Sequence, residues 1–257
     1  MRVLILGGTT EAAALARALT DVEVVTSLAG RTRSPAALPG QVRIGGFGGA
    51  QGLAQYLDAE GIGALVDATH PFAARISANA AEAARLRPTP RLMLVRPEWT
   101  PQSGDRWTMV PGIPAASDAV PGGARAFLAI GRQDLAPFAG RADAWFLIRS
   151  VEPPDGPLPL HHSVITARGP FRVEDEAALL AEHRIDVLVA KNSGGDDAKL
   201  AAARRLGIPA VLVERPALPE GERVGTVEEA VRWVQALPRP RRGRGAGAEG
   251  NERQRRS

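Results

Sequence analysis

The amino-acid sequence predicts an α/β protein made of two Rossmann-like parallel-sheet domains with a ligand cleft between them. Three observations lead to this prediction. Short apolar strands alternate with alanine-rich helical stretches, which is the pattern of parallel sheets covered by helices. The length of 257 residues is sufficient for two domains. A segment of the form helix end, proline, strand and Arg-Pro occurs twice, at residues 85–97 and 205–216, which indicates two related halves.

The first half of the chain contains five predicted strands and three predicted helices. The strands are expected at residues 2–6, 22–26, 41–44, 64–66 and 91–95. The helices are expected at residues 11–19, 50–60 and 72–86. The third helix follows His70 and Pro71, and proline is favoured in the first turn of a helix.

The second half repeats this alternation. Its strands are expected at residues 126–130, 145–150, 163–166, 185–190 and 210–214, and its helices at residues 173–183, 196–206 and 227–237. We therefore expect an N-terminal domain at 1–98, a connecting segment at 99–121 and a C-terminal domain at 122–237. Ligands of open α/β sheets bind beyond the carboxyl ends of the strands, which predicts a cleft between the halves.

The charge of the whole chain differs from the charge of its predicted folded part. Residues 238–257 carry seven arginines and two glutamates, a net charge of +5, whereas the whole chain carries +4. Residues 1–237 therefore carry a charge of about −1. The tail is rich in Arg, Gly and Pro and has almost no apolar residues, so we predict a disordered extension. We do not expect nucleic acid to be a partner.

The composition excludes several classes of site. The chain has no cysteine, so it forms no disulfide and has no thiol nucleophile. The four histidines lack carboxylate partners at ligand spacing, so no metal site is expected. There is no apolar run of about 18 residues, so we expect no membrane span. The chain begins with a strand and shows no signal-peptide pattern, which favours a cytoplasmic protein.

The first strand leads into a diglycine turn and a helix start. Gly7 and Gly8 are followed by Thr9, Thr10 and Glu11. The first N–H groups of a helix have no internal partners and attract anions, and glycine lets a phosphate approach the backbone closely. The turn is a shortened relative of the dinucleotide fingerprint, and an ordinary strand-to-helix turn without a ligand is the alternative.

The end of the second strand indicates which dinucleotide binds. NAD-binding proteins usually place an acidic residue here, about twenty residues after the glycines, to bind the ribose 2′-hydroxyl. This chain has Ser27, with Arg31 and Arg33 just beyond it. A hydroxyl and a guanidinium suit a 2′-phosphate, so NADPH is expected. The alternative is that Arg31 is an ordinary surface arginine.

Two further loops follow strands of the first half. Four glycines surround Phe47 at residues 45–49, a loop that either wraps a flat ligand or simply turns the chain. The fourth strand is followed by Asp67, Thr69 and His70, which are placed to face the ligand crevice. Asp67 or Thr69 could instead cap the next helix.

The informative loop of the second half contains both lysines of the chain. The sequence has thirty arginines and two lysines, and these are Lys191 and Lys199. A lysine at the end of a buried strand, before a diglycine and a helix, is typical of an anion site. The alternative is a solvated helix start with Asp196 and Asp197 in its first turn. Arg168, before Gly-Pro-Phe, could add a guanidinium to the same cleft.

Together these loops resemble the precorrin-6A reductase family of cobalamin biosynthesis. The matching segments are Gly-Gly-Thr-Thr-Glu at 7–11, Ser-Leu-Ala-Gly-Arg at 27–31, Asp-Ala-Thr-His-Pro-Phe-Ala at 67–73, Gly-Pro-Phe at 169–171 and Lys-Asn-Ser-Gly-Gly at 191–195. The resemblance extends to about residue 216, and the tail has no counterpart. It implies reduction of one double bond of the precorrin-6A macrocycle by NADPH, giving precorrin-6B, with both bound between two Rossmann-like domains.

The loops and the resemblance give three groups of candidate site residues. The candidate proton donors are Asp67, His70 and Lys191. The candidate cofactor-binding residues are Gly7, Gly8, Thr9, Thr10, Glu11, Ser27, Ala29, Gly30, Arg31, Gly46, Phe47, Ala68, Thr69 and His70. A macrocycle with many carboxylates needs scattered cations, and the candidate substrate-binding residues are Arg75, Arg168, Gly169, Lys191, Ser193, Gly194 and Gly195.

Two other functions remain open from the sequence. One is a different NADP-dependent Rossmann-type reductase, and the other is a non-catalytic nucleotide-binding protein. Extended Rossmann-type reductases and epimerases are expected to carry a Tyr-x-x-x-Lys pair, but Tyr56 has no lysine after it. Deleting the tail separates a tail-dependent binder, which loses its function, from a reductase, which keeps its turnover.

Overall fold

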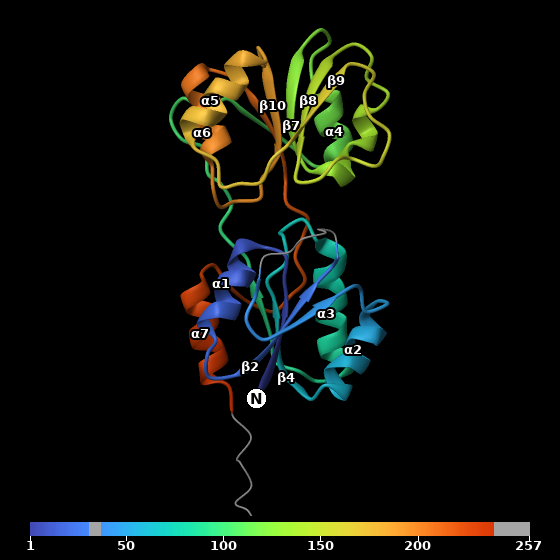
Figure 1. Ribbon diagram of the computed structural model, residues 1–257, viewed down its shortest axis with the longest axis vertical. Helices are drawn as coiled ribbons and strands as arrows, with labels where there is room; N and C mark the ends of the chain where they lie inside the picture. Colours follow the sequence, from blue (N-terminus) through green and yellow to red (C-terminus); the bar gives the residue numbers. More distant parts are fainter. Residues whose placement is uncertain (31–36, 239–257) are drawn as a thin grey trace, which may run out of the picture.

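A computed structural model describes residues 1–30 and 37–238. It contains two six-stranded sheets in which all strand pairs are parallel. Helices cover both faces of each sheet, and the two domains are stacked end to end (Figure 1). The predicted fold class is confirmed. In the described ranges, no helix is both long and apolar enough to cross a membrane.

The first sheet has the strand order β12-β5-β4-β1-β2-β3. Its strands are β1 (Arg2–Leu6), β2 (Glu23–Leu28), β3 (Gln41–Ile44), β4 (Ile62–Asp67), β5 (Arg91–Leu94) and β12 (Glu222–Val224). Helices α1 (Thr10–Ala18) and α7 (Val227–Ala236) pack together on one face. Helices α2 (Ala50–Ala59) and α3 (Ala74–Leu86) pack on the other. The central strands are buried on both faces, which explains their continuous apolar sequences.

The second sheet has the strand order β6-β11-β10-β7-β8-β9. Its strands are β6 (Trp107–Val110), β7 (Arg125–Ala129), β8 (Trp145–Ser150), β9 (His162–Thr166), β10 (Val187–Lys191) and β11 (Ala210–Val213). Helices α5 (Val173–Glu182) and α6 (Ala198–Leu206) pack together over one face. The other face carries α4 (Ile113–Asp118) and the short 3₁₀ helices η1 (Arg132–Asp134) and η2 (Ala136–Phe138).

The structure differs from the expected domain boundaries at both ends of the second domain. Strand β6 lies in the expected connecting segment but pairs with β11 in the second sheet. Strand β12 and helix α7 lie in the expected C-terminal domain but belong to the first: β12 pairs with β5, and Ala230 and Val234 of α7 are fully buried against the first core. The sequence Glu-Arg-Val of β12 has no apolar run, so the sequence did not reveal this strand.

The helix after β4 starts later than expected. Residues 71–73 form a turn, closed by the N–H of Ala73 donating to the carbonyl of His70 at 2.7 Å, and α3 begins at Ala74. Pro71 therefore lies in the turn and not in the first turn of the helix. Residues 71–73 thus lengthen the loop after β4, and Phe72 in this loop faces Lys191 of the second domain.

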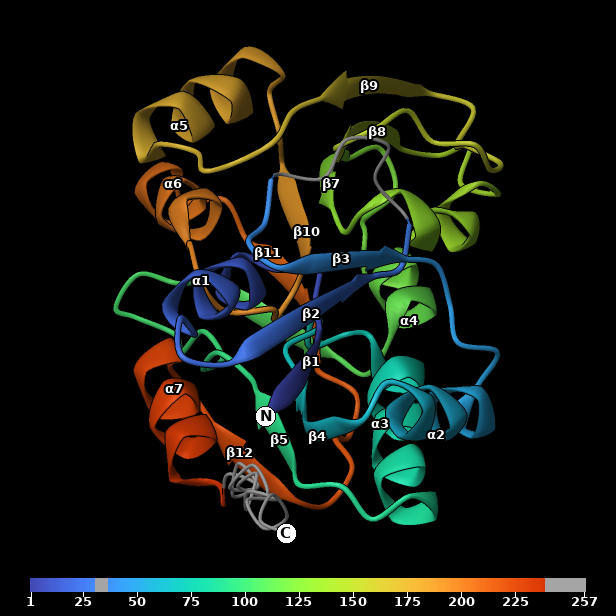
Figure 2. The ribbon, with the colours of Figure 1, turned by 60° about the horizontal axis from the view of Figure 1, so that its bottom comes forward.

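Two segments connect the domains, at residues 95–106 and 214–221 (Figure 1). The first leaves the carboxyl end of β5, and the second leaves the carboxyl end of β11. The loops after the strands of each sheet meet those of the other sheet at the boundary, where Arg96 after β5 contacts Ser193 after β10 and Phe72 after β4 faces Lys191. Figure 2 views the molecule from the side of the first domain, with the strands of its sheet in front of those of the second sheet. The carboxyl ends of both sheets therefore face one another.

Candidate functional site

The first sheet reverses its strand order between β1 and β4, because β2 and β3 lie on one side of β1 and β4 lies on the other. A crevice between such strands is the usual ligand site of this fold. The turn at Gly7 and Gly8 lies on one side of it. The Thr9 hydroxyl donates to the carbonyl of Ala68 on the other side at 2.7 Å, and it accepts from the N–H of Ala12 at 3.1 Å. Thr9 thus caps α1 and joins the two loops.

Gly8 keeps the start of α1 open. Its φ of 112° lies in the region that favours glycine, and nothing lies within 4 Å of where a Cβ would be. Thr10 and Glu11 form the first turn of α1, whose N–H groups lack helical partners. The space at Gly8 is therefore open, and anion binding at this helix start stays a prediction.

Arg43 lies beside Ser27 at the end of β2. The two residues are paired in the parallel register of β2 and β3, and Nη1 of Arg43 lies 3.4 Å from the hydroxyl of Ser27. Arg43 also donates to the carbonyls of Gly45 and Gly46 at 2.5 and 2.7 Å, and its guanidinium lies 3.8 Å from the centre of the Phe47 ring. The sequence analysis missed Arg43, because its proximity to Ser27 depends on strand register.

Of the other residues expected to bind the cofactor just after β2, only Ala29 and Gly30 are among the described residues. Ala29 and Gly30 are exposed at the end of β2. Arg31 and Arg33 lie outside the described residues.

Asp67 closes the loop after β4. Its side chain is buried, and Oδ1 accepts from the N–H of Thr69 at 3.1 Å and from the hydroxyl of Thr69 at 2.7 Å. The alternative that these residues cap a helix is not what the structure contains, because α3 begins five residues beyond Thr69 and has no side-chain cap. The Asp67–Thr69 pair shapes the loop that presents Ala68 and His70.

His70 is neutral at the domain boundary. Burial, followed by the positive charges of Arg96, Lys191 and Arg215, lowers its pKa to about 4, although Glu11 acts in the opposite direction. Nδ1 of His70 accepts from the N–H of Phe72 at 3.2 Å, so the ring proton is on Nε2. At neutral pH His70 can donate a hydrogen bond from Nε2, but it carries no charge.

The second sheet has its own reversal of strand order, between β7 and β10. Lys191 ends β10, and its ammonium forms an ion pair with Asp134 from the loop after β7. The Lys191 nitrogen also lies 5.3 Å from the centre of the Phe72 ring, which belongs to the first domain. The structure therefore brings Lys191 and the His70 loop together across the boundary, which the sequence predicted only as a cleft.

Arg96 joins the two domains at the start of the first connection. Its Nε donates to the carbonyl of Ser193 at 2.7 Å, and its Nη1 lies 3.2 Å from Glu11. Burial acts to raise the pKa of Glu11, but a backbone hydrogen bond and Arg96 outweigh it and hold that pKa below its usual value. The carboxylate of Glu11 is thus paired with Arg96 at the start of α1.

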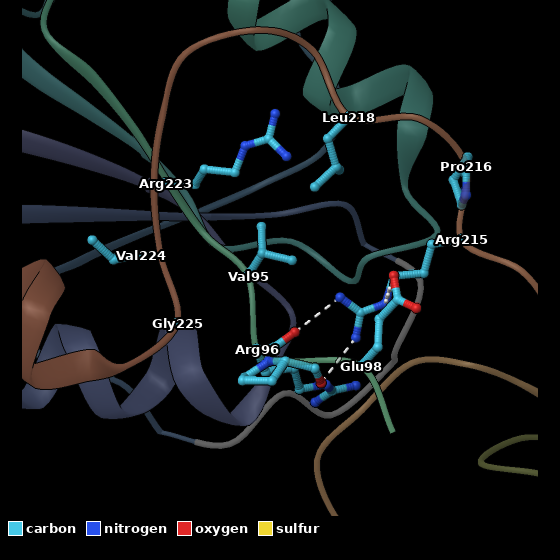
Figure 3. Close-up of a pocket in the computed structure, with 10 residues that line it drawn as sticks. Val95, Arg96, Glu98, Arg215, Pro216, Leu218, Arg223, Val224 and Gly225 are labelled. Atoms are coloured by element: carbon cyan, nitrogen blue, oxygen red, sulfur yellow. Dashed lines mark hydrogen bonds and ion pairs between the residues drawn. The ribbon is translucent and has the colours of Figure 1, made fainter. Parts of the chain in front are cut away.

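Arg215 makes the matching contacts at the second connection. Its guanidinium donates to the carbonyl of Asn192 at 2.7 Å. It also donates to the carbonyls of Arg96 and Pro97 at 2.9 and 3.1 Å (Figure 3). Arg96 and Arg215 are the arginines of the repeated Arg-Pro segments. That repeat was the available signal for them, but the sequence analysis used it only as evidence for two halves.

A cavity of about 440 Å³ lies beside these connections, lined by residues of both connections and of the end of β12 (Figure 3). None of the sequence-predicted site residues lines it. It therefore lies outside the crevices formed by the two strand reversals.

The Lys191 loop is held against the first connection. The side chain of Asn192 accepts from the N–H of Trp99 at 3.0 Å, and the Trp99 indole donates to the carbonyl of Gly195 at 2.9 Å. Gly194 is buried, and a Cβ there would lie 1.9 Å from the carbonyl oxygen of Pro97. Gly194 is therefore required for contact between the loop and the connection, whereas the sequence analysis assigned it to substrate.

Three predicted substrate residues lie on elements other than the loops that hold His70 and Lys191. Arg75 on α3 and Arg168 after β9 are exposed, and within the described residues no hydrogen bond or ion pair joins either to Lys191 or His70. Gly169 precedes Phe171, whose ring lies 3.9 Å from the guanidinium carbon of Arg149. In the part of the chain that the structure describes, no group of three or more His, Asp or Glu residues could hold a metal ion.

A family model described as precorrin-6x reductase CbiJ/CobK matches residues 2–235. This match spans both domains, including β12 and most of α7. The chain belongs to this family. A precorrin-6A reductase of Rhodococcus erythropolis is 54% identical over 93% of this chain and 99% of its own length. A precorrin-6A reductase of Rhodobacter capsulatus is 48% identical over 91% and 95%, respectively.

A solved structure of the same family has the same fold. It is described as CobK precorrin-6A reductase and is 48% identical to this chain, with a TM-score of 0.87 over 91% of this chain and 96% of that one. A cobalt-precorrin-6A reductase of Priestia megaterium is 31% identical over 89% of this chain and 96% of its own length. The resemblance inferred from the loops is thus confirmed at the level of the family.

Proposed function

We propose that this chain uses NADPH to reduce one double bond of precorrin-6A, giving precorrin-6B. Reduction of precorrin-6A follows from family membership, so the chain is an oxidoreductase of cobalamin biosynthesis. The choice of NADPH as cofactor, the residues that bind it and the proton donor are our own assignment. They are supported by one observation above all: the crevice with the glycine turn faces the crevice with Lys191. A cytoplasmic location is part of the same proposal.

The residues of the first crevice fit a dinucleotide phosphate. Gly8 leaves open space over the first turn of α1, and the carboxylate of Glu11 is neutralised by Arg96. Ser27 presents no negative charge to a 2′-phosphate, and Arg43 is a described cation beside it. These residues would hold the cofactor, and the nicotinamide supplies the hydride when it is bound.

Lys191 is the proton donor that the arrangement favours. Asp67 is engaged as a hydrogen-bond acceptor, and His70 is uncharged at neutral pH. The ammonium of Lys191 lies at the boundary, paired with Asp134 and facing Phe72. In this assignment Lys191 gives a proton from Nζ to the macrocycle, and His70 donates a hydrogen bond from Nε2 that orients it.

The macrocycle would occupy the side of the cleft formed by the second domain. The loop after β7 there leads through Gly131 into a three-residue 3₁₀ helix, so this side of the crevice offers a diphosphate no long helix start, unlike the Gly7–Gly8 turn before α1. Arg75 and Arg168 are exposed and remain candidates for the carboxylates of the macrocycle.

The comparisons favour a metal-free macrocycle as substrate. The relatives named precorrin-6A reductase are 48–54% identical to this chain, whereas those named cobalt-precorrin-6A reductase are 30–32% identical. We therefore expect a higher kcat/KM with precorrin-6A than with its cobalt complex.

The experiment that tests this function measures NADPH oxidation with purified precorrin-6A and the mass of the product. A gain of two hydrogens and a clear preference over NADH are expected. Lys191→Gln should lower kcat by about 100-fold or more, since general acids contribute 10²–10⁴-fold. A Lys191→Gln enzyme within about twofold of the unmodified enzyme would exclude Lys191 as the acid. NADPH binding without any turnover would instead support the non-catalytic alternative.

A further inference from the structure

The loop after β7 is a part of the second crevice to which the sequence analysis gave no role. Gly131, with a φ of 85°, turns the chain at the end of the strand, and η1 follows directly. Asp134 is the last residue of η1, and its carboxylate reaches the ammonium of Lys191. Because β7 and β10 are neighbours at the strand reversal, the two residues come from the two sides of one crevice.

Lys191 lies between two different groups. Asp134 contacts it from its own domain, and the Phe72 ring faces it from the other domain at 5.3 Å. The side chain of Lys191 is 17% exposed and that of Asp134 is 33% exposed. A lysine side chain has a flexible four-carbon stem and many rotamers. Its ion pair with Asp134 therefore restricts where the Lys191 nitrogen lies.

The location of the ion pair argues against a role only in stability. Ion pairs that solvent reaches contribute little to folding, and neither Lys191 nor Asp134 is a member of the four buried clusters of the core. The same ammonium is close enough to His70 to help keep that ring neutral. A displaced Lys191 would therefore alter the cleft more than it would alter the fold.

We propose that Asp134 is a positioning residue of the reductase, whose carboxylate holds the Lys191 ammonium at the second strand reversal, facing Phe72 and His70. This inference rests on the proposed function of Lys191. In the step concerned, the hydride adds to one atom of the reduced double bond. The N–H bond of Lys191 breaks to give a proton to the other atom, and NADPH becomes NADP⁺. Lys191 regains its proton from water, and Asp134 touches neither reactant.

The experiment compares Asp134→Asn, Asp134→Glu and Asp155→Asn in the full-length enzyme, with NADPH and purified precorrin-6A. Asp155 is a matched control, because it is an exposed aspartate that pairs with Arg132 of the same loop and does not pair with Lys191. We expect Asp134→Asn to lower kcat by at least about tenfold while KM for NADPH and Tm stay unchanged. Asp134→Glu should restore most of kcat, and Asp155→Asn should match the unmodified enzyme.

Two further readouts separate positioning from a structural role. Proton delivery should become slower in Asp134→Asn, so its solvent deuterium isotope effect on kcat should rise. In the Lys191→Gln background, Asp134→Asn should have little additional effect, because the group that it positions is gone.

The outcomes keep this inference distinct from the proposed function. If Lys191→Gln is slow but Asp134→Asn equals the unmodified enzyme, the role of Asp134 is wrong and that of Lys191 stands. If the two effects on kcat multiply in the double variant, Asp134 acts independently of Lys191 and the inference is overturned. If Lys191→Gln keeps full activity, both assignments are wrong.

Discussion

His70 and Lys191 lie at the same domain boundary, but their surroundings differ. Burial and three neighbouring cations make the protonated form of His70 unfavourable. Lys191 instead has the carboxylate of Asp134 as a partner and faces the Phe72 ring. In the proposed function the two residues have separate roles, a hydrogen-bond donor for His70 and a proton donor for Lys191.

The lowered pKa of His70 predicts a loss of stability in acid. Between about pH 6.5 and pH 4 the unfolded chain binds a proton at this residue and the folded protein does not. The free energy of unfolding should therefore fall as pH is lowered through this window. From pH 7 to pH 5 the loss is about 2 kcal/mol. Urea unfolding at both pH values should show this loss in the unmodified protein but not in His70→Gln.

The exposed His161 provides the control for that measurement. His161→Gln should have the same pH dependence as the unmodified protein. An equal loss of stability in His70→Gln and the unmodified protein would show that His70 is not the group responsible.

At the scale of elements, two helices of the first domain begin with the same kind of cap but in different places. Thr9 caps α1 at the crevice, and Thr226 caps α7 in a capping box with Glu229. Thr9 also donates across the crevice to Ala68, whereas the contacts of Thr226 lie within its own helix start. Both threonines cap a helix in the same way, but only Thr9 also connects two loops of the first crevice.

This difference gives a matched pair of variants. Thr9→Val and Thr226→Val should each lower the free energy of unfolding by about 1 kcal/mol through loss of a helix cap. Only Thr9→Val should also weaken NADPH binding, because it separates the two loops of the first crevice. Isothermal titration of NADPH with both variants checks this, and equal affinities would argue against the placement of the cofactor at Thr9.

For the whole molecule, the described chain crosses between the domains twice, and its last helix, α7, lies in the domain where the chain began. Helix α7 packs on α1, the helix that follows the Gly7–Gly8 turn, and the indole of Trp233 donates to Glu222 of β12 at 2.7 Å. Arg96 and Arg215 then fix the two connections to the second domain. Strand β12 and helix α7 therefore complete the first domain and cover α1.

Truncation tests this arrangement. A chain ending at Gly221 lacks β12 and α7, so it should expose the apolar face of α1, lose much of its Tm and bind the dye ANS. A chain ending at Pro238 lacks only residues 239–257 and should keep full turnover and Tm. Equal stability of the two truncated chains would contradict the role of α7 in the first domain.

The sequence predicted most strands, most helices and the loops at their carboxyl ends, because these depend on local periodicity and turn chemistry. It missed β6, a four-residue strand inside the expected connecting segment, and β12, a three-residue strand without an apolar run. It placed Asp67, His70 and Lys191 at the ends of strands, and the structure places these ends at one boundary. It did not identify Arg43, Arg96, Asp134 or Arg215, since nothing local distinguishes them from other charged residues.

The sequence alone determined that this protein is a two-domain α/β protein with a glycine turn and a lysine loop, because strand, helix and turn preferences act over a few residues, and its loop motifs indicated the family. The tertiary structure decided which strands pair, where each domain ends and which charges meet. Arg96 reaches Ser193, 97 residues away, and Arg43 meets Ser27 only through strand register. Such contacts depend on packing between distant segments, and packing also neutralises His70 and brings Asp134 to Lys191.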